Sequence, residues 1–223
     1  MKAVTVEDNY PYNFKKDGEL QGLGFDVINT LAQRAGFKLS IEILPWTRAL
    51  KTAATEPSVL IFSLARMPDR ENLYYWFGPM VVREIWLYKL SSRTDITISS
   101  LEDIKRYQVG DTASNATLLV MKNLGIKADT APSDLSSCRK FKIGRVDLVP
   151  IDPMGISAFM TGCGLAPEQA EKVILLARNM GLYIGIGKNT PPEIVNRLNV
   201  EFEAMRKDQT LQKINDKWKF SPD

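Results

Sequence analysis

The stretch Val59–Arg70, with the sequence VLIFSLARMPDR, indicates how the rest of the chain is organised. Its first four residues, Val59–Phe62, are apolar and rich in β-branched and aromatic side chains, which is typical of a buried strand. Ser63–Arg66 leaves the strand. Pro68–Glu71 then has the composition of a first helical turn, with proline at its first position and acidic residues near its positive end.

Three polar residues of this stretch follow the strand: Ser63, Arg66 and Arg70. Ligands of open α/β sheets bind beyond the carboxyl ends of the strands, so these side chains are candidate ligand contacts. Arginine offers a planar, always charged fork that matches a carboxylate. We therefore predict that Arg70 holds the acid group of a small ligand. The alternative is a solvated helix arginine paired with Asp69 or Glu71, an interaction worth under ~1 kcal/mol.

The composition is that of a soluble globular protein and excludes several classes of function. Of the 223 residues, 44% are hydrophobic and 25% are charged, which suits one large domain or two lobes. Lys and Arg number 29 against 26 Asp and Glu, without a basic block, so nucleic-acid binding is not expected. No apolar run approaches the ~20 residues that span a bilayer.

The absence of histidine removes histidine-based catalysis and histidine zinc sites. Cys138 and Cys163 are too few and too far apart for a zinc or iron–sulfur ligand set. We therefore expect no metal or other cofactor, and hydrolysis by metal or nucleophile is disfavoured.

The N-terminal part of the chain alternates strands and helices, the βαβ pattern of a parallel sheet covered by helices. Met1 and Lys2 lead straight into a strand, as in a cytosolic protein or in a processed secreted protein with a new start methionine. The expected elements are a strand at Lys2–Glu7, an aromatic loop at Asp8–Phe14, a polar turn at Lys15–Gly18, a helix at Gly24–Ala35, a strand at Lys38–Leu44, a helix at Trp46–Ala54 and the strand at Val59–Phe62.

After an extended segment at Trp86–Leu90 and a polar link, the alternation begins again. Ser100 with Asp103 resembles a capping box for a short helix. The further expected elements are a strand at Tyr107–Gly110, a polar loop at Asp111–Asn115, helices at Ala116–Asn123 and Ser133–Ile143, a strand at Val146–Ile151, helices at Met154–Gly162 and Pro167–Lys172, extended segments at Val173–Ala177 and Tyr183–Ile186 with Arg178–Gly181 between them, and helices at Pro191–Lys207 and Thr210–Trp218.

This order predicts two α/β lobes. Residues 1–90 with 178–223 form the first, discontinuous lobe, and residues 91–177 form a second lobe inserted into it. Two strands, near Trp86–Leu90 and Val173–Arg178, would cross between the lobes.

Several short motifs follow one another along nearly the whole chain in the order seen in one protein family. Each is weak alone, but together they resemble family 3 extracellular solute-binding proteins, the polar amino-acid receptors of ABC importers. The motifs are Tyr10-Pro11-Tyr12, Gly24-Phe25-Asp26, Pro45-Trp46, Pro68-Asp69-Arg70, Trp76-Phe77-Gly78-Pro79, Leu101-Glu102-Asp103, Gly144-Arg145-Val146-Asp147 and the ending Leu211–Trp218.

The resemblance implies an α/β, two-lobed fold of the type II periplasmic-binding-protein kind, with two hinge strands. It implies a small zwitterionic or acidic ligand, an amino acid or close relative, enclosed between the lobes. It further implies a monomeric binding protein in the periplasm whose signal peptide has been removed, with an ABC permease of the inner membrane as its partner. On this basis the protein is neither an enzyme nor a nucleic-acid-binding protein.

The resemblance also assigns roles to residues. Arg70 stands where the family grips the α-carboxylate, Asp152 stands where it takes the α-ammonium, and Trp46 stands where an aromatic stacks on the ligand. The loop before the second lobe's first long helix, with Thr112, Ser114 and Asn115, is matched loosely to further carboxylate contacts, and Tyr10 completes the expected set.

For most of these residues a structural role is the alternative. Asp152 followed by Pro153 suits a helix N-cap, which leaves an outer oxygen for an ammonium group. Trp46 suits a core position. Ser114 and Asn115 suit the cap of the helix that begins at Ala116.

The sequence departs from the family pattern at the carboxylate motif. Met67 replaces the family's threonine, Ala65 replaces a serine or threonine, and Arg66 is an added charge. Arg48 is a second additional cation near the expected site. Arg66 and Arg48 are more often surface charges, but an arginine cluster would make an anion pocket and would favour a ligand with an extra acidic group.

Two further questions stay open at this point. Cys138 and Cys163 form a disulfide, worth ~2–4 kcal/mol, or are two buried thiols. A cleft enzyme of the cyclohexadienyl dehydratase kind is the alternative function, and it would need a carboxylate base with a raised pKa, for which Glu7, Asp8 and Asp111 are candidates. The ligand-sensing domain of a membrane receptor is a third function.

Overall fold

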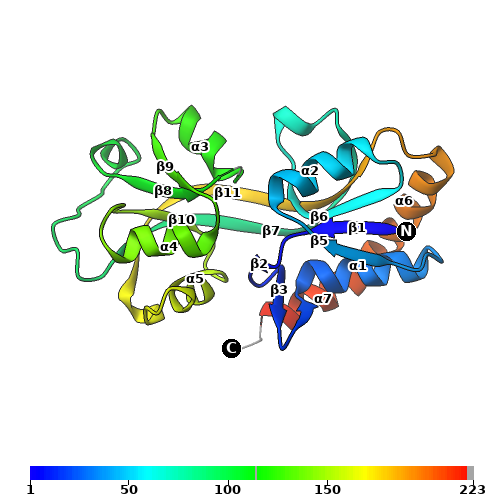
Figure 1. The fold of residues 1–223 in the computed structure, drawn as a ribbon, viewed down its shortest axis with the longest axis horizontal. Helices are drawn as coiled ribbons and strands as arrows, with labels where there is room; N and C mark the ends of the chain where they lie inside the picture. Colours follow the sequence, from blue (N-terminus) through cyan, green and yellow to red (C-terminus); the bar gives the residue numbers. More distant parts are fainter. Residues whose placement is uncertain (114, 220–223) are drawn as a thin grey trace. The chain divides into compact units, whose positions relative to one another are not determined.

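The computed structural model describes residues 1–113 and 115–219, so the predicted site residue Ser114 lies outside the described residues. The chain forms two compact units. Unit 1 comprises Met1–Val82 and the chain from Gly181 onward, and unit 2 comprises Arg83–Met180. Figure 1 follows the chain through both by colour. The sequence-based division at residues 90/91 and 177/178 stays a prediction about which parts move as lobes.

Unit 1 is built on a sheet whose central strands are parallel. β1 (Lys2–Thr5) lies between β5 (Ser40–Ile43) and β6 (Val59–Ala65) and pairs with both in parallel. The last part of β11 (Ala170–Gly187) pairs with β6 in the antiparallel sense. Every residue of β6 is buried, as expected for a strand covered on both faces.

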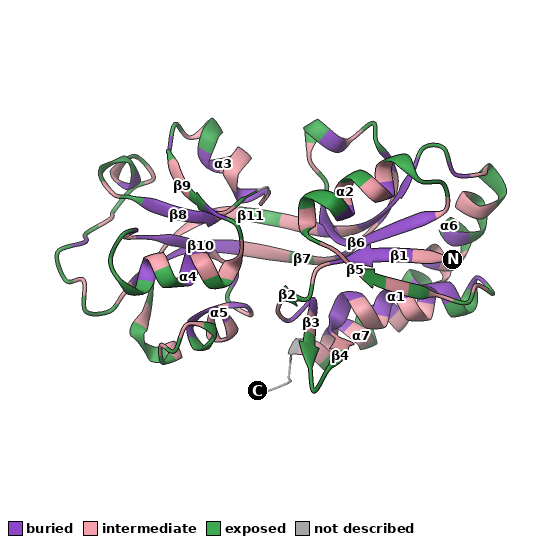
Figure 2. Cartoon of the chain, viewed as in Figure 1, coloured by how far each residue is buried: buried purple, intermediate pink, exposed green. Residues whose placement is uncertain are grey.

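Helices cover both faces of the unit 1 sheet. α2 (Trp46–Thr55) packs on β6 and β1, and α1 (Leu23–Arg34) contacts β6 on the other side (Figure 1). α6 (Pro192–Lys207) and α7 (Thr210–Lys219) pack against α1 and against each other. Figure 2 shows β1 and β6 as largely buried, while β5 at the edge of the sheet is partly exposed.

The segment before α1 is a small antiparallel sheet, where the sequence analysis expected a loop and a turn. Its strands are β2 (Asp8–Asn9), β3 (Asn13–Lys16) and β4 (Glu19–Gln21). Asp17 and Gly18 join β3 to β4, and both have positive φ, as a type I′ hairpin turn requires. The prediction missed the hairpin because its strands are short and polar and lack the alternation of a half-buried strand.

In unit 2, β10 (Val149–Ile151) pairs antiparallel with β7 (Tyr74–Leu90), whose other neighbour in the sheet is β11. β8 (Val109–Thr112) pairs in parallel with β9 (Ala128–Ala131). A bridge from Val109 to Leu148 links the pairs. The helical elements are α3 (Thr117–Asn123), α4 (Asp134–Lys142), α5 (Ile156–Gly162), η2 (Glu102–Arg106) and η3 (Pro167–Gln169).

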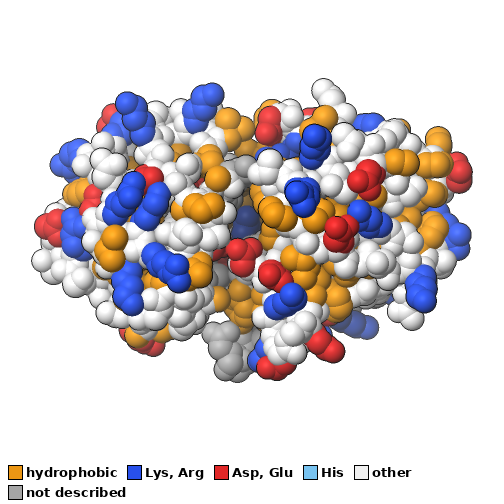
Figure 3. All heavy atoms as spheres, viewed as in Figure 1, with side chains coloured by type: hydrophobic (Ala, Val, Ile, Leu, Met, Phe, Trp, Pro, Cys, Tyr) orange, Lys and Arg blue, Asp and Glu red, His pale blue; other side chains and the backbone are white. Residues whose placement is uncertain are grey.

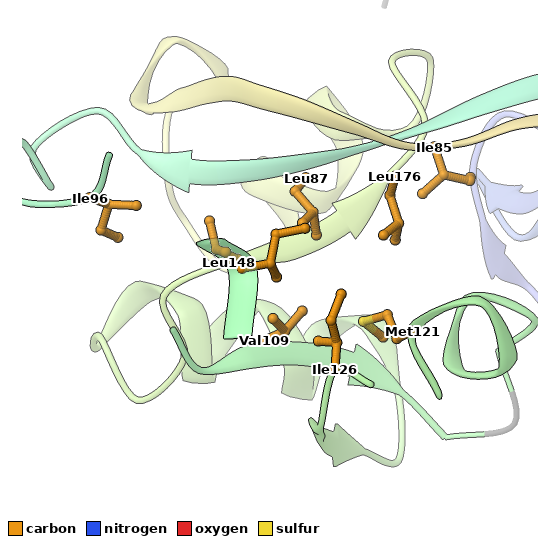
Figure 4. Packing of buried hydrophobic residues seen from close by; sticks show 9 residues of the cluster. Ile85, Leu87, Ile96, Val109, Met121, Ile126, Leu148 and Leu176 are labelled. Atoms are coloured by element: carbon orange, nitrogen blue, oxygen red, sulfur yellow. The ribbon is translucent and has the colours of Figure 1, made fainter. Parts of the chain in front are cut away.

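Unit 2 has two hydrophobic clusters because neighbouring residues of a strand point to opposite faces. Leu87 of β7 packs with Val109 and Met121 in the first cluster, shown in Figure 4. The next residue, Tyr88, packs in the second cluster with Cys138 and Phe141. Strand β7 therefore contributes to both cores of unit 2.

β7 and β11 are longer than the sequence analysis predicted. β7 extends over 17 residues rather than only Trp86–Leu90, and β11 is continuous over Ala170–Gly187 without the expected link at Arg178–Gly181. The predicted helix at Pro167–Lys172 is only the short η3, after which β11 begins. Gly78 and Pro79 lie within β7, and β7 and β11 each run from one unit into the other.

The two cysteines are joined. Cys138 of α4 and Cys163, which follows α5, form a disulfide with a Cα–Cα distance of 5.9 Å, which resolves the open alternative. Charged side chains of both signs are interspersed on the face drawn in Figure 3. Within residues 1–113 and 115–219, no helix combines the length and apolar character needed to cross a bilayer.

Candidate ligand-binding site

Arg70 is a buried cation in the segment that follows β6. It closes the short helix η1 (Pro68–Arg70), in which its backbone N–H donates to the carbonyl of Met67 at 3.1 Å. Its side chain is 10% exposed, and its one ion pair among the described residues is to Asp69 at 3.5 Å, whose side chain is 66% exposed. The burial contradicts a solvated arginine, while the ion pair to Asp69 is one of the two that this alternative named. A buried cation with so weak a partner is suited to binding an anion.

Ser63 lies within β6, where the sequence analysis had placed it beyond the strand. It is a non-glycine residue with φ of 58°, and its Oγ is buried without a hydrogen-bond partner among the described atoms. A Cβ placed on Gly24 of α1 would lie 2.3 Å from this Oγ, so the hydroxyl is directed at the start of α1. Strained backbone and an unsatisfied hydroxyl together mark a position that costs stability.

Arg66 is part of an exposed cluster and is already neutralised. Both Nε and Nη2 donate to the carboxylate of Glu71, which raises the pKa of Arg66 and lowers that of Glu71. Its guanidinium lies 5.6 Å from the ring centre of Trp76 and 5.9 Å from that of Tyr183. This pairing favours the surface-charge interpretation, while the role of Arg66 in ligand binding stays a prediction.

The two predicted aromatic contacts take part in packing. Trp46 is the first residue of α2 and is half-buried against the cluster that contains Val4 and Ala53. The half-buried ring of Tyr10 lies 4.7 Å from that of Phe14 between ring centres. The roles of Trp46 and Tyr10 in ligand binding stay predictions.

Asp152 follows β10 and caps the turn into α5, as the structural alternative expects. Its Oδ1 accepts from the backbone N–H groups of Met154 at 3.0 Å and Gly155 at 3.1 Å. Its Oδ2 accepts from Nη1 of Arg83 at 3.1 Å, and the two side chains are 6% and 14% exposed. The carboxylate expected to take an ammonium group thus already has a buried cationic partner.

Sequence reasoning missed Arg83. The available signal is a charge in the extended run Val81–Leu90, which is otherwise mostly apolar. Its partner Asp152 is 69 residues away, so no local pattern connects the two.

The donors at and after the end of β8 are directed at two acidic residues of unit 2, Asp111 of β8 and Asp134 of α4. Asn115 Nδ2 donates to Oδ1 of Asp111 at 3.0 Å, and the hydroxyl of Thr117 donates to Oδ2. The hydroxyl of Thr112 donates to Oδ1 of Asp134 at 2.5 Å. Thr112 and Asn115 therefore donate within unit 2, and their roles in ligand binding stay a prediction.

Asp111 is the group with the most displaced pKa in this loop. Burial raises the pKa of its carboxyl to about 7, against the hydrogen bonds from Thr117, Thr112 and Asn115, and the charge of Asp134 adds to the rise. Burial also raises the pKa of Asp8 in unit 1. Both had been considered as bases for the alternative enzyme.

A comparison with protein families shows which family the chain belongs to. The family model of the bacterial extracellular solute-binding proteins, family 3, matches residues 1–222. The chain belongs to this family. The resemblance found in the sequence motifs is thereby confirmed.

Individual relatives of this solute-binding protein are distant but cover nearly its full length. The L-cystine-binding protein TcyA of Bacillus subtilis is 22% identical, over 97% of this chain and 80% of that protein. An ancestral arginine-binding protein bound to arginine has a TM-score of 0.83 at 21% identity, over 99% of this chain and 97% of the other. A histidine kinase sensor domain with similarity to periplasmic binding proteins has a TM-score of 0.84 at 14% identity, over 98% and 95%. The predicted type II periplasmic-binding-protein fold is confirmed.

Proposed function

We propose that this solute-binding protein is the periplasmic receptor of an ABC importer and encloses a small carboxylate ligand, an amino acid or a close relative, between its two units. Membership of family 3 supports the class of function. The observation that carries the ligand class is Arg70, a guanidinium that is 10% exposed and whose ion-pair partner is an exposed aspartate. Such a group gains most from a ligand that brings its own negative charge.

The proposed mechanism is closure of the two units on the ligand. Arg70 belongs to unit 1, while Asp152, Thr112 and Asn115 belong to unit 2. A ligand that contacts groups of both units binds the closed form better than the open form, and it shifts the equilibrium by that difference in affinity. Small-angle X-ray scattering with and without ligand measures the resulting decrease in radius of gyration.

Replacing Arg70 tests the carboxylate contact. Arg70→Ala removes one partner of a desolvated charge pair, which costs ~2–5 kcal/mol of binding free energy, so isothermal titration calorimetry should detect no binding at micromolar ligand. The matched control is Arg206→Ala, on the exposed surface of α6 and paired with Glu203, which should leave affinity unchanged. Equal affinity of Arg70→Ala and wild type, with both variants folded by circular dichroism, would contradict the assignment.

A thermal-shift screen identifies the ligand. The panel contains the twenty amino acids, L-cystine and small dicarboxylates. A ligand at 100 times its Kd adds ~2.7 kcal/mol of stability, which gives a clear rise in Tm. A panel without any shift would argue against the proposed function as a whole.

A dehydratase acting on a cyclic acid is the second candidate, and the raised pKa of Asp111 is the observation that favours it. The hydrogen bonds of Thr117, Thr112 and Asn115 to this carboxyl favour a structural role instead. Incubation with prephenate should therefore leave the substrate unchanged. Consumption that is lost in Asp111→Asn would make the protein an enzyme.

A further inference from the structure

One face of α4 in unit 2 exposes cations and large apolar side chains together. Arg139 follows Leu135 by four residues, and Lys142 and Ile143 follow about one turn later, so the four lie on one side of the helix. All four are exposed, Leu135 by 41% and Ile143 by 77%. The buried residues of α4 are Ser137, Cys138 and Phe141.

The end of the helix adds a further cation to this side. Gly144 has φ of 70°, its backbone N–H donates to the carbonyl of Phe141 at 3.1 Å, and that of Arg145 donates to the carbonyl of Lys140 at 2.9 Å. This is a Schellman ending, which turns the chain back onto the last turn of the helix. The side chain of Arg145 is 63% exposed. The exposed surface formed by Leu135, Arg139, Lys142, Ile143 and Arg145 is called the α4 face.

The α4 face is positively charged because it has few acidic neighbours. Residues 127–145 include five lysines and arginines but only two acidic residues, and this excess of three equals the net charge of the whole chain. Asp129 is shared by Lys140 at 2.6 Å and Arg145 at 3.2 Å. Asp134 lies at the other end of α4, where it accepts from the hydroxyl of Thr112. Among the charged side chains, Figure 3 shows mainly Lys and Arg where α4 lies.

Two cations of the α4 face have no acidic partner among the described residues. Arg139 forms no ion pair with any of them. Lys142 donates to the backbone carbonyls of Cys163 at 2.9 Å and Gly164 at 3.3 Å, neither of which carries a net charge. The positive charge of both side chains is therefore available to an external anionic partner.

The α4 face is also fixed to its neighbour in unit 2. Cys138 on the buried side of α4 is bonded to Cys163, and the carbonyl of Cys163 accepts from Lys142. A surface that is already ordered loses less entropy on binding than a mobile one.

The helix dipole explains part of this composition, since cations in the last turn of a helix stabilise it. It does not explain why Leu135 and Ile143 are exposed between these cations. Aliphatic side chains among cations fit a partner that is negatively charged at its surface and apolar beneath it. A bilayer that contains anionic lipids has this character.

We propose that the α4 face docks the protein on a membrane surface that contains anionic lipids. Arg139, Lys142 and Arg145 contact the head groups, and Ile143 inserts between them. Each cation near such a surface strengthens binding about fivefold. The inference uses unit 2 alone and does not depend on the proposed ligand.

Co-sedimentation with lipid vesicles tests the proposal on the full chain with its disulfide intact. One set of vesicles contains phosphatidylglycerol and phosphatidylethanolamine, and the other contains phosphatidylcholine alone. We expect binding to the anionic vesicles at low salt, with affinity about tenfold or more above that for phosphatidylcholine. This binding should decline as salt is added, because exposed charges are screened. Equal binding to both sets, or no binding to the anionic set, would overturn the proposal.

Two variants separate the contributions of charge and of the apolar side chain. Arg139→Glu changes the charge by two units and should weaken binding to the anionic vesicles by roughly 25-fold. Ile143→Ser leaves the charge unchanged and should weaken binding about fivefold, because less apolar area is buried in the bilayer. Both positions are exposed, so circular dichroism and urea unfolding should match wild type.

Arg206→Glu is the matched control for net charge. Arg206 lies on α6 of unit 1, where it pairs with Glu203, and the variant should bind the anionic vesicles as wild type does. If it weakens binding as much as Arg139→Glu does, net charge rather than the α4 face is responsible and the proposal fails. If Ile143→Ser binds as wild type while Arg139→Glu does not, the partner is an acidic surface such as that of a protein, and the membrane assignment is wrong.

Discussion

Asp111 shows how a single residue links the pH of the medium to the stability of unit 2. Its carboxyl is buried, which raises its pKa from an ordinary value near 4 to about 7. Between these values the unfolded chain releases the proton while the folded protein retains it. Folding stability therefore falls as the pH rises from about 4 to about 7, since the charged form is disfavoured in the folded state.

Asp111→Asn removes this titration while retaining a side chain of the same size. The variant should show a shallower loss of stability between pH 4.5 and pH 7.5, measured as the free energy of unfolding in urea. Asp208, whose pKa is lowered to about 2, acts at lower pH and with the opposite sign, so it does not interfere. Identical pH slopes in the variant and the wild type would rule out Asp111 as the source.

Ser63 is a second residue whose effect on the free energy of unfolding can be measured. Its φ of 58° favours glycine, and its buried hydroxyl has no partner among the described atoms. Ser63→Gly should raise the free energy of unfolding by about 1 kcal/mol, since it relieves backbone strain and removes an unsatisfied group.

The same variant tests the predicted ligand contact. If Ser63 meets the ligand, Ser63→Gly gains stability but loses affinity in calorimetry. A variant that is less stable than wild type would show that the hydroxyl has a structural role.

At the scale of elements, the disulfide links α4 covalently to the residue that follows α5. Cys138 and Cys163 are 25 residues apart and lie in the cluster with Phe141 and Met160. Loop-closure entropy for such a separation predicts about 3 kcal/mol of stabilisation. The double variant Cys138→Ala/Cys163→Ala should lose this amount in urea unfolding at pH 7. An equal loss on adding reductant to wild type would confirm that the bond, rather than the cysteine side chains, is responsible.

Helices and strands with clear apolar spacing and clear terminal signals were predicted from the sequence, and those without such signals were not. The helices α1, α2, α4 and α6 and the strands β1, β5 and β6 were placed to within a few residues, because apolar spacing and terminal signals such as Gly36 and Pro191 agree there. β9 was missed because its sequence, ADTA, is short and only weakly apolar. The helical turn at Pro68 was foreseen, but it ends after three residues as η1.

For the molecule as a whole, the order of motifs along the chain was enough to predict the family and the fold. The contacts at the candidate site could not be predicted as well from the sequence. Arg70 could be proposed from its position after β6, but its burial could not. The pairing of Arg83 with Asp152 depends on β7 and β10 being neighbours, with Trp86 opposite Ile151, and this long-range register is not visible in sequence.

Unit 1 contains both ends of the chain, and this has a consequence for biosynthesis. Asp26 of α1 accepts hydrogen bonds from Lys217 and Trp218 of α7, and β6 needs the last part of β11 as its neighbour. While the ribosome is still translating the middle of the message, the first strands and α1 have emerged without these partners. Arg83–Met180 is contiguous and can collapse as it appears. If translation stops before Gly181, unit 2 can fold, but the sheet of unit 1 lacks β11 and keeps an unpaired edge. Such a chain would be recognised by chaperones and proteases.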